Sequence, residues 1–422
     1  MRKVRLFCLA LLGALFLASF ASEQPAYAHA FHAVLLRSDP GNSSLLSQGP
    51  ASIRLLFSEP VQPVGQAIQV LSPANKAVGH GRLQINGLQL TMPVDVSQTG
   101  TYRVIWQVIS PDTDPVSGRF VFSVGHPAGP WSGTSASGVT PLGTWLQVLA
   151  HWLHFLGYAL GFGTLAFRQF VLRPSVSSEH TNTEQVLWRL VSLGILALVL
   201  AEPVALLAQN ASLGTGSLFD PDIIGDILSS SFGRVLAQRL SAGLLLWVLI
   251  GVVKQGEERG SWLILGLGLA LALIDGEASH AITSRALWLG LLANMLHVIA
   301  MGVWVGGLVA FLSLKCAQAW RDQRNELTAR FGKLAMLAVI ELIVSGLLLA
   351  WLHLVNPADL LTTNYGKVLA AKTCVVLITL LLAFLGVRVY QHKHIHWWTL
   401  EAITLTLILA LAALLISLPP PI

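Results

Sequence analysis

The sequence predicts two kinds of structure in one chain: an all-β sandwich domain, followed by an all-α bundle of about eight membrane-spanning helices. Of its residues, 54% are apolar and 11% are charged, whereas soluble proteins average roughly 25% charged residues. After about residue 145 the apolar residues gather in long runs, which are typical of membrane helices. Before that point, short β-prone runs alternate with Gly, Pro, Asn and Asp, as in antiparallel β domains.

Residues 1–28 have the pattern of a secretory signal peptide. Basic residues precede an apolar stretch, and Ala26-Tyr27-Ala28 forms a cleavage motif with small residues at its ends. A second candidate motif, Ala28-His29-Ala30, leaves the mature amino terminus at either His29 or Phe31. Export through this signal would place the following domain outside the membrane.

Residues 29–126 are expected to form the β domain. A length of roughly 95 residues suits an Ig-like or cupredoxin-like Greek-key sandwich. The domain contains no cysteine, so no disulfide bond stabilises it. Residues 127–144, rich in Gly, Pro and Ser, are expected to be a flexible linker. The clearest strand candidates are 53–57, 67–71, 88–92, 102–109 and 119–124.

Residues 145–422 are expected to form the membrane domain, with eight segments of the roughly 20 residues that a bilayer requires. The fourth is the weakest, because Asp275 and Glu277 interrupt its end. If the first segment runs inward, most loop Arg and Lys residues fall on the cytoplasmic side, as the positive-inside rule requires. We therefore attribute the net charge of +5 to basic residues that flank the membrane segments on the cytoplasmic side, and not to nucleic-acid binding. The segments are 145–170, 187–208, 233–253, 262–281, 287–313, 333–354, 367–388 and 397–418.

The membrane domain carries a weak internal repeat. Residues 232–239 and 365–372 share an aromatic residue, Gly, a basic residue, Val, Leu, Ala and a second basic residue in the same order. His154 and His297 also occupy matching positions in the first and fifth segments. We therefore expect two four-helix repeats related by a pseudo-axis along the membrane normal.

The two parts of the chain resemble two families that work together. Residues 32–40 and 115–122 look like the mature start and the closing strand of the periplasmic copper-binding protein CopC. Residues 297–308, residues 365–367 and the last segment beginning near Glu401 look like CopD, its inner-membrane partner. The resemblance implies a CopC–CopD fusion that serves copper resistance, transport or homeostasis at the bacterial inner membrane.

Four residues are candidate Cu(II) ligands in the β domain. His29 and His32 lie near the mature amino terminus, where an imidazole and the free α-amine can chelate one ion and favour Cu(II). The resemblance adds Asp112 and Asp114, in a loop between two late strands. In CopC the first histidine is commonly the amino-terminal residue, and a histidine stands where this chain has Asp114. His29 compensates for these departures, or the site binds more weakly, or it is remodelled; alternatively, the histidines belong to a tail and the aspartates to a turn.

Histidines and methionines of the membrane domain are the next candidate ligands. Ionisable residues are costly inside a bilayer and therefore mark candidate functional sites. A thioether together with an imidazole suits Cu(I), and both groups gather near the outer ends of the segments. The alternative is that the histidines hydrogen-bond to neighbouring helices and the methionines pack in the core. The candidates are His151, His154, His280, His297, Met295 and Met301.

Two carboxylates fall well inside the second and sixth segments. Glu202 and Glu341 could serve a proton or cation pathway, or could pair with a basic residue such as Arg239 or Lys372. We favour structural pairing. The Gly306-Gly307 pair is expected to allow close helix approach.

These observations favour a protein that captures Cu(II) outside the inner membrane and moves copper across it, toward the cytoplasm. A second hypothesis is a copper relay or sensor without transport, which delivers copper to a partner; a periplasmic copper chaperone is a candidate partner in either case. A third is a haem-containing membrane oxidoreductase, but the histidine spacing fits it poorly. The sequence shows no Walker motif and no CxxC, so we expect no ATP-driven transport within this chain and no enzymatic activity.

Overall fold

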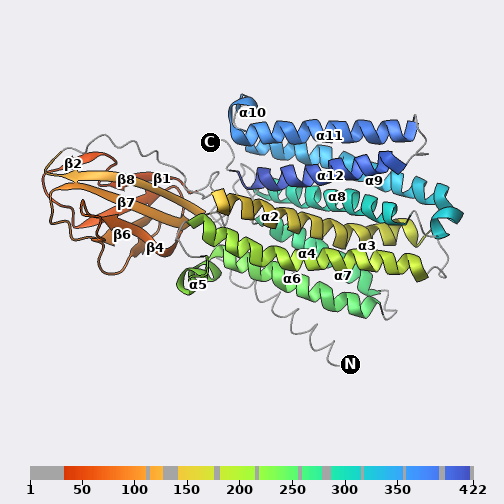
Figure 1. Cartoon of the computed structure of the whole chain (residues 1–422), viewed down its shortest axis with the longest axis horizontal. Coiled ribbons are helices and arrows are strands. Elements are labelled where there is room, and N and C mark those ends of the chain that lie inside the picture. The colour runs from red at the N-terminus through yellow and green to blue at the C-terminus, as the bar shows by residue number, and fades with distance from the viewer. Residues whose placement is uncertain are drawn as a thin grey trace. The chain divides into compact units, whose positions relative to one another are not determined.

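The computed structural model describes ten stretches of the chain, which form two compact units. Among the described residues, one unit contains the strands together with residues 141–146, 206–213 and 218–234, and the other contains the rest of the helical residues (Figure 1). The described stretches are 33–110, 115–126, 141–174, 181–213, 218–254, 259–277, 287–314, 318–354, 358–388 and 395–418. The signal peptide and most of the linker expected from the sequence lie outside them.

The strands form a sandwich of two four-stranded sheets, which confirms the predicted fold class. One sheet has the order β1-β3-β6-β5 and the other β2-β8-β7-β4. The five predicted runs correspond to β3, β4, β6, β7 and β8, whereas three short strands were not among them. The strands are β1 (Leu35–Asp39), β2 (Ser44–Leu46), β3 (Ser52–Phe57), β4 (Gln62–Leu71), β5 (Gln84–Asn86), β6 (Gln89–Pro93), β7 (Gly100–Ile109) and β8 (Pro115–Val124).

The core of the sandwich follows from the alternation of side chains along its strands. In β7, Tyr102, Val104, Trp106 and Val108 are buried, because every second residue of a strand faces the same side. The Tyr102 ring stacks on Phe122 with ring centroids 5.2 Å apart. Its hydroxyl donates a hydrogen bond of 2.8 Å to a main-chain carbonyl in the preceding turn, so the one polar atom of this core residue is satisfied.

Each predicted apolar segment is helical over most of its described residues. Among the described residues, six helical stretches are long and apolar enough to span a membrane, and the apolar parts of the fourth and eighth segments are shorter, 260–276 and 403–416. The first stretch is continuous from α2 (Pro141–Tyr158) through the π-helical turn η1 (Ala159–Gly163), α3 (Thr164–Phe167) and the π-helical turn η2 (Arg168–Leu172). The other helices of these segments are α4 (Thr181–Leu213), α6 (Ser231–Val253), α7 (Arg259–Glu277), α8 (Leu287–Ser313), α9 (Gln318–His353), α11 (Asn364–Arg388) and α12 (Ile395–Ile416).

Glycines allow α8 to lie directly against the first helical stretch. A Cβ atom on Gly163 would lie 1.9 Å from the carbonyl oxygen of Gly302, and one on Gly306 would lie 1.8 Å from that of Ala159. Both distances are far below a van der Waals contact, so only glycine fits at either position. The expected close approach at Gly306 is confirmed. Gly307 faces another helix, since a Cβ there would lie 2.8 Å from the ring of Phe331 in α9.

The unit that contains the sandwich also includes a short helix, α5 (Pro221–Ser229), which the sequence did not predict. Its amino end is capped by Asp220, whose side chain accepts a hydrogen bond from the amide of Asp222. Ile223 and Ile227 of α5 pack in one apolar cluster with Val64. The short helix α10 (Asp359–Thr362) precedes α11 in the other unit.

Candidate functional site

Strand register brings the two attachment points of the predicted Cu(II) site to one end of the sandwich. Leu35, at the start of β1, pairs with Phe57 at the end of β3. The chain then turns into β4, whose first residue, Gln62, pairs with Ile109 at the end of β7. The chain segment before residue 33 and the loop 111–114 are therefore joined to the sandwich at the same end. The ligand candidates themselves, His29, His32, Asp112 and Asp114, lie outside the described residues.

A buried carboxylate that the sequence analysis overlooked lies at this same end. Glu59 follows β3 and is 1% exposed. Next to it, the hydroxyl of Ser58 accepts a hydrogen bond of 2.9 Å from the amide of Val34. Glu59 stands in a Ser-Glu-Pro turn, which carries no hydrophobic pattern that distinguishes a buried acid from a solvated one. Only its burial in the structure singles Glu59 out, because a carboxylate is costly to bury unless it is paired or binds a metal.

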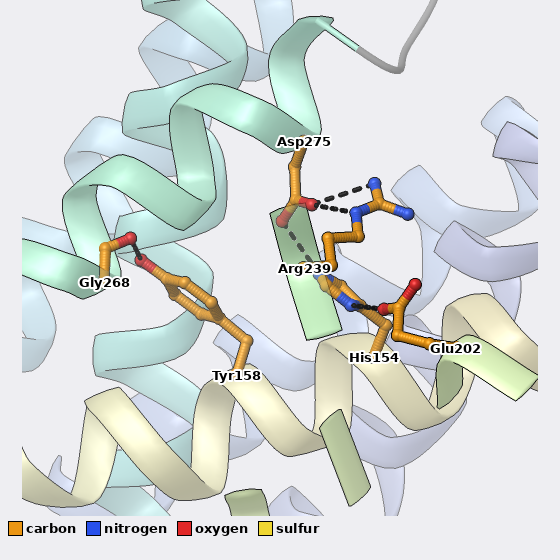
Figure 2. A network of polar contacts seen from close by, with 6 residues as sticks. All are labelled: His154, Tyr158, Glu202, Arg239, Gly268 and Asp275. Carbon is orange, nitrogen blue, oxygen red and sulfur yellow. Dashed lines mark hydrogen bonds and ion pairs between the residues drawn. The ribbon is translucent and has the colours of Figure 1, made fainter. Parts of the chain in front are cut away.

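In the membrane domain, His154 is the centre of a buried polar cluster (Figure 2). Its Nε2 atom lies 2.9 Å from Oδ2 of Asp275, and its Nδ1 atom lies 3.5 Å from Oε1 of Glu202. Arg239 contacts the other oxygen of Asp275 with Nε at 3.0 Å and a terminal nitrogen at 2.9 Å. Each of α2, α4, α6 and α7 contributes one residue, so the cluster joins the four long helical stretches of the first half.

With both carboxyl groups ionised, the charges of this cluster balance when both ring nitrogens of His154 carry protons. Carboxylate oxygens are acceptors, so Nε2 donates its hydrogen bond to Asp275, whereas Nδ1 is within ion-pair distance of Glu202. The ring is then an imidazolium, and together with Arg239 it neutralises Asp275 and Glu202. A neutral cluster is far cheaper to bury than a net charge. The arrangement leaves His154 without a lone pair for a metal ion.

The tyrosine one turn after His154 extends this polar layer. Tyr158 is 3% exposed, and its hydroxyl donates a hydrogen bond of 3.0 Å to the main-chain carbonyl of Gly268 in α7 (Figure 2). The sequence analysis missed Tyr158 and interpreted Asp275 only as an interruption of the fourth segment. A charged residue inside an apolar run was the available signal for Asp275. Glu202 was expected to pair with a basic residue such as Arg239; its contact is with His154, whereas Arg239 pairs with Asp275.

His297 occupies the matching position of the repeat but has different neighbours. Its Nδ1 atom lies 3.0 Å from the hydroxyl oxygen of Ser345 in α9. That hydroxyl donates a hydrogen bond of 2.6 Å to the main-chain carbonyl of Glu341. A Cβ atom on Gly346 would lie 3.3 Å from the His297 ring, so this glycine makes room for it. Among the residues that the structure describes, no carboxylate pairs with His297.

The remaining candidates are dispersed. His151 places Nδ1 at 3.2 Å from the hydroxyl of Ser417 in α12. Met295 and Met301 are partly buried and pack against the hydrophobic core, Met301 against two of its clusters. His280 lies outside the described residues. Within the described stretches, no group of three or more His, Cys, Asp or Glu residues is arranged to hold a metal ion.

Three family models match successive parts of the chain. The CopC domain matches residues 35–125, the copper resistance protein D-like N-terminal domain matches 142–288, and copper resistance protein D matches 325–417. The chain belongs to the CopC–CopD copper resistance family. The boundary between the first two matches falls between the sandwich and the first long helix, in agreement with the order of the fusion.

Relatives in the CopC–CopD family align with most of the chain or with one of its parts. Copper transport protein CutJ of Bacillus subtilis is 29% identical over 81% of this chain, and the alignment spans 65% of CutJ. Inner membrane protein YebZ of Escherichia coli is 24% identical over 64% of the chain and 98% of its own length. Copper resistance protein C of Xanthomonas campestris is 34% identical over 22% of the chain and 80% of its own length. Together with the apolar helices, these matches indicate a multi-pass inner-membrane protein.

Proposed function

We propose that this protein captures Cu(II) outside the inner membrane and moves copper through its helices toward the cytoplasm. The observation that carries the proposal is the joining of a CopC domain to CopD helices in one chain. Copper bound by the first domain can then reach the helices without a separate carrier protein that diffuses between them. In this proposal the β domain faces the periplasm, and a periplasmic chaperone can supply the metal. The protein catalyses no chemical reaction.

The proposed Cu(II) site consists of His29, His32 and Asp112, with Asp114 as a further oxygen donor. Strand register supports it, because the amino-terminal segment and the loop 111–114 start from one end of the sandwich. Imidazole ligands favour Cu(II) over the other common divalent ions. Glu59, buried at the same end, adds a carboxylate to the surroundings of this site.

The proposed path through the helices uses His297 with the neighbouring methionines, and His151 and His280 at its outer end. Thioethers select Cu(I), so the copper is reduced before it enters. Two Cu(II) ions each gain one electron from a pair of external thiols, which join in one disulfide and release two protons. His154 also remains a predicted ligand, but it would have to give up the contact with Asp275 or Glu202 before it could bind a metal.

Cellular copper content tests this proposal. Cells that express the chain are expected to hold more copper, measured by mass spectrometry after washing with a chelator that cannot cross the membrane. A chain with both His32→Ala and Asp112→Ala serves as the control and should hold less. The second candidate function, a relay without transport, predicts copper that the external chelator removes. Equal chelator-resistant copper with and without the chain would refute transport.

A further inference from the structure

We propose that Nε2 of His297 is the atom that binds Cu(I) in the membrane domain, and that Ser345 is the positioning residue that presents it. The thioether of Met301 is the second ligand. This inference rests on the proposed copper path, and it assigns the ligand atoms that the path requires.

The argument begins with the one proton of the Ser345 hydroxyl. A hydroxyl has a single O–H donor, and a main-chain carbonyl can only accept. The Ser345 oxygen lies 2.6 Å from the carbonyl oxygen of Glu341, one helical turn earlier, so its proton is used in that bond. Ser345 is 2% exposed, so this orientation is not exchanged for a bond to water.

The tautomer of His297 follows from this bond. Its Nδ1 atom lies 3.0 Å from the same hydroxyl oxygen, which can now only accept. Nδ1 therefore carries a hydrogen and donates it. In a neutral imidazole one nitrogen is the donor and the other has a lone pair, so Nε2 has the lone pair. Metal-binding histidines are held in this way, with the second ring nitrogen donating to a neighbouring acceptor.

His154 provides an internal comparison. It occupies the matching position of the repeat, but its Nε2 donates to Asp275 and its Nδ1 lies within ion-pair distance of Glu202, so both nitrogens face carboxylates. His297 makes its one hydrogen bond, among the described residues, through Nδ1. The two histidines are equivalent in the sequence pattern, yet only His297 offers a lone pair. The structure thus separates a charged, structural histidine from one prepared to bind a metal.

Helical spacing selects Met301 over Met295 as the second ligand. Residues four apart lie on the same face of a helix, whereas residues two apart do not. Met301 follows His297 by four positions, and Met295 precedes it by two. Met301 is partly buried and packs against two core clusters. Imidazole with thioether is a ligand pair suited to Cu(I).

The test is an anaerobic titration of the purified full-length chain with Cu(I), in competition with the chelator bicinchoninate. His297→Ala should remove one equivalent of Cu(I). Ser345→Ala should weaken that equivalent by about 10–100-fold, as loss of a partner behind a metal ligand does. Ser345→Thr keeps the hydroxyl and should restore the affinity. Met301→Leu should weaken binding, and Met295→Leu is its matched control and should not.

A spectroscopic measurement on the unmodified chain complements the titration. The ¹⁵N shifts of His297, assigned by difference from His297→Gln, should show hydrogen on Nδ1 in the copper-free protein. Hydrogen on Nε2, or an unchanged number of Cu(I) equivalents in His297→Ala, would overturn the assignment, whether or not cells accumulate copper. If cells gain no copper but His297→Ala loses its equivalent, transport fails and the ligand assignment is upheld.

Discussion

The packing of α8 against the first helical stretch makes Gly306 the position most sensitive to a single methyl group. A Cβ atom at Gly306 would lie 1.8 Å from the carbonyl oxygen of Ala159, 2.7 Å from its carbonyl carbon and 2.9 Å from the Cα atom of Gly163. All three are main-chain atoms, so no side-chain rotation can make room. The substitution Gly306→Ala must push the two helices apart along this seam.

The expected cost follows from these contacts. Overpacking a well-packed interior costs typically about 1–3 kcal/mol, and the rigid backbone partners place Gly306→Ala at the upper end of that range. Alanine recovers about 0.5–1 kcal/mol through its better helix propensity. We therefore expect Gly306→Ala to lower the free energy of unfolding by about 2 kcal/mol.

The assay is reversible unfolding of the full chain in mixed micelles with increasing SDS, followed by circular dichroism. Gly332→Ala in α9 is the matched control, because a Cβ there meets no atom within 4 Å. This control should leave stability unchanged or raise it by up to about 1 kcal/mol. Equal effects of the two substitutions would refute the packing argument.

Three further predictions concern the buried cluster, the copper site and the sandwich. Asp275→Asn should destabilise the chain by about 3–5 kcal/mol in the same unfolding assay, because it leaves buried cations without a counter-charge. The control Glu326→Gln, which breaks an exposed ion pair, should cost less than about 1 kcal/mol. Similar losses of stability in the two variants would contradict the role of Asp275 as the counter-charge of the buried cluster. His32→Ala and Asp112→Ala should each weaken Cu(II) binding of the full chain in a calorimetric titration, and unaltered binding in both would exclude the predicted ligands. Tyr102→Phe should destabilise the sandwich by about 1–3 kcal/mol, because the two hydrogen bonds of the Tyr102 hydroxyl are lost. Hydrogen exchange of the β7 amides measures this loss, and unchanged exchange rates would contradict the prediction.

The helices and the longer strands could be predicted because their signals are local. An apolar run of sufficient length identifies a spanning helix, and alternation identifies a strand such as β7. The short strands β2 and β5 have three residues each and mostly exposed or half-exposed side chains, too little for a pattern. The helix α5 owes its position to apolar contacts with the sandwich that lie far away in sequence.

The sequence identified which histidines are candidates for the membrane site, but not the different roles that these histidines have in the structure. The sequence marked His154 and His297 as equivalent, and nothing local distinguishes them. Their difference comes from Asp275, 121 positions away from His154, and from Ser345, 48 positions away from His297. Such pairs are decided by helix packing, which a single sequence does not specify. The Gly306 contact was predictable because paired small residues in a membrane helix indicate close approach.

The most direct test of the central claim is copper uptake into liposomes that contain the purified full-length chain. Copper is added outside together with an excess of a thiol, which reduces it to Cu(I), and the metal trapped in the lumen is measured after external chelation. Copper should accumulate in the lumen with the unmodified chain and fall toward the level of protein-free liposomes with His297→Ala. Lumenal copper equal to that of protein-free liposomes, although the β domain binds Cu(II) when no thiol is present, would contradict transport and favour a relay.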